Sequence, residues 1–153
     1  MNWRQARMHH TFLFQEGFWN VRGYYFDDME NTLPLMGIAR ITHIEGLWVN
    51  EGEMEITAGE KPIKIYNRYE ITPFREGKTQ TTWESKNPDL GTLLGRFVIV
   101  NDAILSTCRA KSGAYTGVEF LLKISNTHYQ NRGVLLKGID KLSSWSVDLR
   151  KAS

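Results

Sequence analysis

The feature that most constrains the fold is a succession of short segments rich in Val, Ile, Phe, Tyr, Trp and Thr, separated by Gly, Asn and Asp. Such segments favour β-strands, and the residues between them favour turns. The Asn101-Asp102 pair is typical of a two-residue hairpin turn. The expected strands cover residues 11–27, 36–45, 47–57, 62–73, 78–84, 93–100, 103–109, 115–124, 129–139 and 144–150.

Several segments alternate between apolar and polar residues, which indicates antiparallel sheet with one wet face. The predicted inward faces comprise Ile63, Ile65, Tyr69 and Ile71 in one segment, Val118, Phe120, Leu122 and Ile124 in a second, and Trp145, Val147 and Leu149 in a third. In the second segment, Glu119 and Lys123 then fall on the solvent face. Inward and outward residues are therefore assigned from this period of two.

Short connections favour a meander of neighbouring strands, and closure of that meander would remove its exposed edges. We therefore predict an all-β fold, an antiparallel up-and-down barrel of about 8–10 strands in a single domain over residues 1–153. A two-sheet sandwich is the structural alternative. Residues 1–10 are expected to be a frayed or helical segment, and residues 87–92 also leave room for a helical turn.

Composition excludes several classes of protein. The single cysteine cannot form a disulfide within the chain, and a net charge of +2 without any basic run gives no nucleic-acid interface. No apolar stretch approaches the ~18–20 residues of a membrane-spanning helix. The first ten residues lack the apolar core of a signal peptide. We expect a cytoplasmic protein without a membrane span.

The triplet Gly17-Phe18-Trp19 in the first segment resembles the Gly-x-Trp motif of the calycins, the superfamily of lipocalins and fatty-acid-binding proteins. In lipocalins this Trp closes one end of the barrel and a late Arg packs across its ring, a position that Arg150 would occupy here. The chain looks most like compact bacterial calycin-like barrels, including the ten-stranded, haem-binding nitrobindins. It departs from lipocalins in lacking their late helix, and from fatty-acid-binding proteins in having too few residues at 28–34 for two inserted helices.

Metal and cofactor sites have little support. The four histidines are His9, His10, His43 and His128, and neighbouring residues such as the first two point to opposite faces of a strand. No cofactor is predicted, and haem bound by His43 or His128 is the lesser alternative. Glu51, Glu53 and Glu55 share one strand face, where three like charges are expected to meet water.

Nucleophilic catalysis has equally little support. Cys108 shares a strand face with Ile104 and Ser106, which is typical of a small core residue. The sequence contains no nucleophile elbow, dinucleotide-binding loop or phosphate-binding loop.

The aromatic residues supply the candidate site, because several fall on segments that should line the barrel. Small barrels can hold one ligand, and such pockets are mostly apolar. Asn67 and Thr81 interrupt apolar faces and would need hydrogen-bond partners inside, and Arg132 or His43 could orient a ligand. The predicted ligand-binding residues are His43, Trp48, Asn67, Tyr69, Thr81, Trp83, Phe97, Phe120 and Arg132.

The sequence therefore predicts a barrel that binds a small hydrophobic or amphipathic molecule in its interior. One alternative is an enzyme that uses the same cavity, such as an isomerase, a cyclase or a bilin-attaching lyase. A buried ionisable group with a shifted pKa beside a pocket would distinguish such an enzyme from a binding protein. Another alternative is a structural module with a filled core and an exposed apolar patch, compatible with a homodimer.

Overall fold

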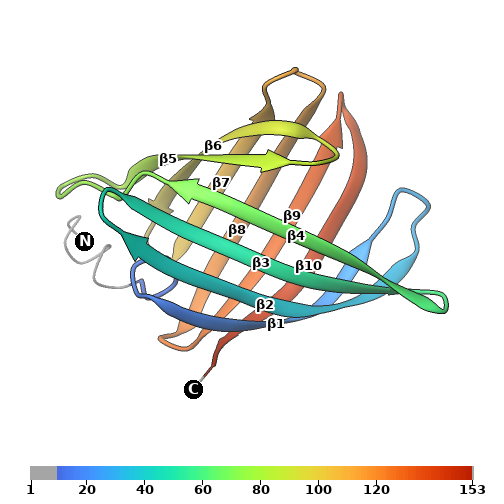
Figure 1. The fold of residues 1–153 in the computed structure, drawn as a ribbon, viewed down its shortest axis with the longest axis horizontal. Helices are drawn as coiled ribbons and strands as arrows, with labels where there is room; N and C mark the ends of the chain where they lie inside the picture. Colours follow the sequence, from blue (N-terminus) through green and yellow to red (C-terminus); the bar gives the residue numbers. More distant parts are fainter. Residues whose placement is uncertain (1–9, 153) are drawn as a thin grey trace.

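The alternating segments form ten antiparallel strands that close into one up-and-down barrel (Figure 1). The computed structural model describes residues 10–152. Each strand pairs with its neighbour in the sequence, and β1 pairs with β10 to close the sheet. The strands are β1 (Gly17–Phe26), β2 (Thr32–Ile44), β3 (Leu47–Ala58), β4 (Lys61–Ile71), β5 (Gln80–Asn87), β6 (Gly91–Val100), β7 (Ala103–Ala110), β8 (Tyr115–Ser125), β9 (His128–Lys137) and β10 (Asp140–Lys151).

The predicted strands all correspond to observed ones, and the barrel rather than the sandwich is confirmed. The predicted turn at Asn101 is also confirmed, because this residue has a φ of 52° between β6 and β7. Residues 88–90 form a turn, so the helical turn considered there is absent. No helix occurs in residues 10–152, and hence none that could cross a membrane.

Residues 10–16 precede β1 and lie across one end of the barrel. The sequence pattern predicted that the first strand begins at residue 11, whereas it begins at Gly17. His10 is buried, and its Nε2–H donates to the carbonyl of Asn101 at 2.9 Å. The Tyr129 hydroxyl lies 2.8 Å from His10 Nδ1 and accepts from the Thr11 amide at 3.1 Å. Because Thr11 Oγ1 also donates to the Asn126 carbonyl, the segment ties two hairpin turns together. His10 is thus not frayed, and the rest of the predicted N-terminal segment lies outside the described residues.

The barrel wall is weakest between β4 and β5, which diverge in Figure 1. The ladder pairs only Glu70 with Glu84 and Ile71 with Trp83, whereas β4 pairs with β3 along its whole length. Residues 61–69 of β4 therefore present one unpaired edge. This edge carries lysines, an arginine and Pro62, residue types that discourage pairing with another strand.

The predicted inward face of β8 is wrong. Val118 and Phe120 are 49% and 39% exposed, while Gly117, Glu119 and Leu121 point inward. The cause is the register of the β7–β8 hairpin, which pairs Cys108 with Gly117 and Ser106 with Glu119. Because the side-chain period is two, the inward face of β7 sets the inward face of β8. Phe120 thus lies on the outside of the barrel.

Candidate functional site

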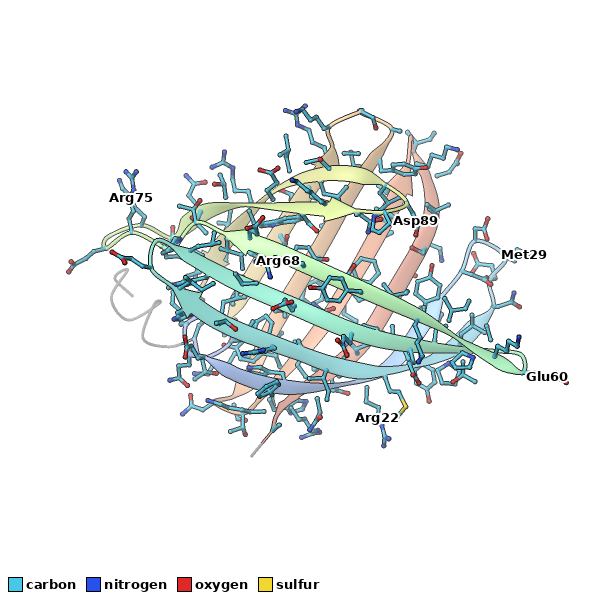
Figure 2. All side chains as sticks on the ribbon, in the orientation of Figure 1. Arg22, Met29, Glu60, Arg68, Arg75 and Asp89 are labelled. Carbon is cyan, nitrogen blue, oxygen red and sulfur yellow. The ribbon has the colours of Figure 1, made fainter. Side chains whose placement is uncertain are left out.

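An interior cavity of about 430 Å³ opens at the end of the barrel opposite residues 10–16. Asn87, Asp89 and Leu90, where β5 turns into β6, lie at its mouth, and Figure 2 marks Asp89 there. A larger hollow of about 1130 Å³ lies along β1–β4 and β10, but exposed side chains form much of its wall. The interior cavity is the candidate site, because inward-facing side chains from all around the barrel line it and would take much of a ligand's surface out of water.

Two tryptophans lie flat against glycines of neighbouring strands and extend along the cavity wall. Trp83 pairs with Gly95 and Trp145 with Gly133, and a methyl group on either glycine would collide with the indole ring. The missing side chains therefore create the space that the rings occupy. Trp83 Nε1 also donates to Ser106 Oγ at 3.1 Å, which fixes that ring further.

The polar centre of the cavity is a carboxyl group on β8. Trp145 Nε1 lies 3.0 Å from Glu119 Oε2 and 2.8 Å from Asn131 Oδ1, so one N–H faces two acceptors. Burial raises the pKa of Glu119, and hydrogen bonds from Asn131 and Trp145 lower it only in part. The barrel therefore holds a carboxyl group that resists ionisation more than an exposed glutamate.

Two further ionisable groups face Glu119. Burial raises the pKa of the Tyr69 hydroxyl well above its usual range, and the charges of Glu119 and Cys108 add to this effect. Burial and the charge of Glu119 likewise raise the pKa of the Cys108 thiol. Cys108 lines the cavity but is unsuited to be a nucleophile, because the reactive thiolate is disfavoured.

Four of the predicted ligand-binding residues line the cavity. They are Asn67, Tyr69, Trp83 and Phe97. Trp83 packs edge-on to Tyr69, with ring centroids 5.0 Å apart, and lies 6.0 Å from Phe97. The aromatic residues of β4, β5 and β6 therefore form one continuous section of the wall.

Three predicted residues serve the closed end instead. His43 stacks on Trp48 at 4.3 Å, and its Nε2–H donates to the Leu13 carbonyl at 2.7 Å. The Thr81 hydroxyl donates to the Thr72 carbonyl at 2.6 Å, which satisfies this buried group without a ligand. These side chains hold residues 10–16 and the β4–β5 connection in place, and they lie outside the cavity lining.

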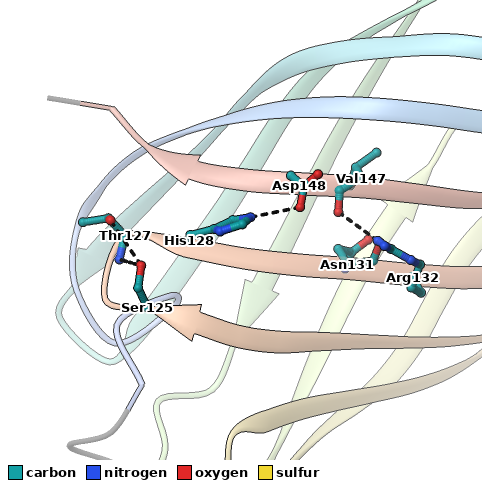
Figure 3. Close-up of polar contacts among 7 residues, drawn as sticks. All are labelled: Ser125, Thr127, His128, Asn131, Arg132, Val147 and Asp148. Carbon is teal, nitrogen blue, oxygen red and sulfur yellow. Dashed lines mark hydrogen bonds and ion pairs between the residues drawn. The ribbon is translucent and has the colours of Figure 1, made fainter.

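Phe120 faces outward, so its predicted placement on the inner face is wrong, and Arg132, predicted as a residue that could orient a ligand, also faces outward. Arg132 lies within β9. Figure 3 shows its guanidinium donating to the carbonyls of Asn131 and Val147, at 2.9 and 3.3 Å. The residues before and after it in β9, Asn131 and Gly133, belong to the inner face.

The motif tryptophan is placed as the calycin resemblance implies, but its expected partner is not. Trp19 is buried and packs edge-on to Phe12 and Tyr129, with centroid distances of 5.3 and 5.7 Å. Arg150 pairs with Asn20 on the outer face, so it cannot lie across the Trp19 ring. The residue paired with Trp19 is Lys151, one position later.

Sequence reasoning missed Glu119, Asn131 and Trp145 as a polar network. The signal that could have found Glu119 is the short connection between β7 and β8. With Ser106 assigned inward, a tight hairpin places Glu119 opposite it on the same face. The other face of β8 carries more apolar residues, so the alternation pattern favoured it as the inner face. In the structure that face lies on the outside of the barrel.

The described histidines do not point into the cavity. His128 Nε2 lies 2.9 Å from Asp148 Oδ1 on the outer face (Figure 3), and His43 and His10 bond within the closed end. Within residues 10–152, no group of three or more His, Cys, Asp or Glu could hold a metal ion.

Comparisons with known proteins bear on the fold. No family model matches the chain, and no curated protein sequence matches it. The solved structure of the S-type phycobiliprotein lyase CPES from Guillardia theta aligns with a TM-score of 0.66 at 7% identity, covering 100% of this chain and 94% of the lyase. A putative AttH from Nitrosomonas europaea aligns with a TM-score of 0.29 at 10% identity, over 89% of this chain and 51% of that protein. At that TM-score the second likeness says nothing about the fold. The closed ten-stranded barrel and its match to the lyase show that the chain has a calycin-like fold.

Proposed function

We propose that this protein binds a small, largely apolar molecule inside its barrel. The observation that carries the proposal is the interior cavity of about 430 Å³, with aromatic walls and a half-buried polar network at Glu119. Ligand sites in proteins are typically concave spaces of about 300–1,000 Å³ with mostly apolar walls and few polar groups. Burial of the ligand's apolar surface would supply most of the binding free energy.

The likeness to a phycobiliprotein lyase supports this proposal at the level of architecture. A protein of similar fold is named there as a phycobiliprotein lyase, so the fold is compatible with handling a small molecule. At 7% identity, the likeness carries no residue roles to this chain.

The test is saturation binding of the neutral fluorescent probe N-phenyl-1-naphthylamine. We expect one site per chain, and we expect Ala39→Leu to weaken binding at least about fivefold, because Ala39 lines the cavity and the larger side chain fills it. Ala103→Leu is the matched control, since Ala103 is not part of the cavity lining. Absence of saturable binding, or equal affinities in both variants, would contradict the proposal.

A second candidate function is acid–base catalysis in the same cavity, and Glu119 is the observation that favours it. A half-buried carboxyl group with a raised pKa keeps its proton to a higher pH than an exposed glutamate, and it can exchange that proton with a bound ligand, as isomerases and cyclases require. Turnover of a bound ligand that Glu119→Gln abolishes, with binding retained, would favour the enzyme over the binding protein.

A further inference from the structure

The ionisable groups of the cavity are acids. Among residues 10–152, Asp89 at the mouth and Glu119 inside carry the carboxyl groups of the lining, and no Lys, Arg or His contributes to it. Arg132 on β9 and Arg150 on β10 face outward. The interior therefore offers a negative charge or a neutral carboxyl group, and it disfavours an anionic ligand.

The partners of Glu119 are neutral. Its Oε2 lies 3.0 Å from Trp145 Nε1, an N–H group that also faces Asn131 Oδ1. No ion pair between described residues reaches this carboxyl group. A half-buried carboxylate without a cation is costly, so a cationic ligand would be the complement that the described side chains do not provide.

The aromatic walls suit the same ligand. Tyr69, Trp83, Phe97 and Trp145 all line the cavity together with Glu119. Faces of aromatic rings attract ammonium groups, most strongly where water is excluded, and they also accept the apolar body of a ligand.

From the acidic interior and its aromatic walls, we infer that the cavity binds a hydrophobic amine, whose ammonium group pairs with Glu119 while its apolar body contacts the rings of Tyr69, Trp83 and Phe97. This assignment rests on the proposed function, since it names the class of molecule that the same cavity takes. A fatty acid or another hydrophobic anion is the ligand that it excludes.

Three probes with one apolar body test the assignment: 1-naphthylmethylamine, 1-naphthylmethanol and 1-naphthaleneacetate, titrated into the full chain by calorimetry at one pH and salt concentration. We expect the amine to bind about tenfold more tightly than the alcohol, and the carboxylate to bind weakest. Glu119→Gln keeps an acceptor for Trp145 and should reduce the amine's affinity to that of the alcohol, without changing the affinity for the alcohol. Glu84→Gln, on the exposed face of β5, is the control and should leave all three affinities unchanged.

The outcomes separate the two proposals. Binding of the carboxylate as tightly as the amine, or an amine-to-alcohol ratio that Glu119→Gln leaves intact, overturns the amine assignment while leaving a ligand-binding cavity. Binding of none of the three probes overturns both. The comparison among probes uses the unmodified chain, so it decides the question even if Glu119→Gln fails to fold.

Discussion

At the scale of single residues, Glu119 is the least expected feature of the interior. Its carboxyl group lies inside a barrel wall built from aromatic and aliphatic side chains, and its pKa is raised by burial. A group whose pKa is higher in the folded than in the unfolded state binds its proton more tightly when folded, so ionisation opposes folding.

Glu119→Gln should therefore change how stability depends on pH. The unfolded glutamate titrates near 4.5, and the folded one titrates higher. Below pH 4.5 both states are protonated, and as the pH rises above that value the wild type loses stability relative to the variant until the folded group has also ionised. Urea unfolding of both proteins between pH 4 and 8 measures this difference. Glu84→Gln, on the exposed face of β5, is the control, and an identical trend in the two variants would refute the assignment.

A second residue-level prediction concerns the glycine beneath Trp145. Gly133→Ala puts a methyl group against the indole ring, so the ring must shift from the position in which its N–H faces Glu119. We expect a loss of about 1–3 kcal/mol in unfolding free energy, with an altered near-ultraviolet circular dichroism spectrum. Gly52→Ala is the matched control, because its methyl group meets only the flexible end of Met54 at 3.1 Å and should cost less. Equal losses in the two variants would contradict this account.

At the scale of elements, residues 10–16 act as the floor of the barrel. Phe14 packs against Trp48 and Phe74, with centroid distances of 5.3 and 5.0 Å, and hydrogen bonds from this segment reach three hairpins. Tyr129 links it to β9 through its hydroxyl group. The closed end is thus held by polar contacts around an aromatic cluster.

Tyr129→Phe should loosen this floor. The substitution removes the hydroxyl group that hydrogen-bonds to His10 Nδ1 and to the Thr11 amide, so both buried groups lose that partner. We expect a loss of about 1–3 kcal/mol in unfolding free energy, measured by urea denaturation. Tyr24→Phe is the control, since Tyr24 is exposed and should tolerate the change. A loss in Tyr129→Phe no larger than in the control would show that the hydroxyl group is not needed.

The seam between β4 and β5 gives a prediction of its own. Alternate amides of residues 61–69 face the side where β5 does not pair, so they lack the protection of a ladder hydrogen bond. We expect these amides to exchange with deuterium much faster than those of β9, which pairs on both sides. Two-dimensional NMR spectra recorded during exchange measure this. Uniform protection along β4 would show that the seam is closed in solution.

At the scale of the whole molecule, closure of the barrel gives each strand two faces of different character. The inner faces build a core at one end and a cavity toward the other, where Asn67 and Tyr69 from β4 meet Glu119 from β8. On the outside, Leu105, Val118 and Phe120 form an apolar patch over β7 and β8, with Leu105 paired to Phe120. Apolar alternation alone therefore does not tell the inner face from the outer one.

The sequence by itself determined the ten strands, their order and the inward direction of Asn67, Tyr69, Trp83 and Phe97, because these follow from local periodicity and turn residues. Only the tertiary structure decided the β8 register and the placement of residues 10–16, since each depends on contacts between segments far apart in the chain. The same holds for Arg150, whose outward direction is set by its pairing with Asn20 across the closing strands. Glu119 became an interior residue for this reason: its own segment favours the opposite face, and pairing with β7 overrides that preference.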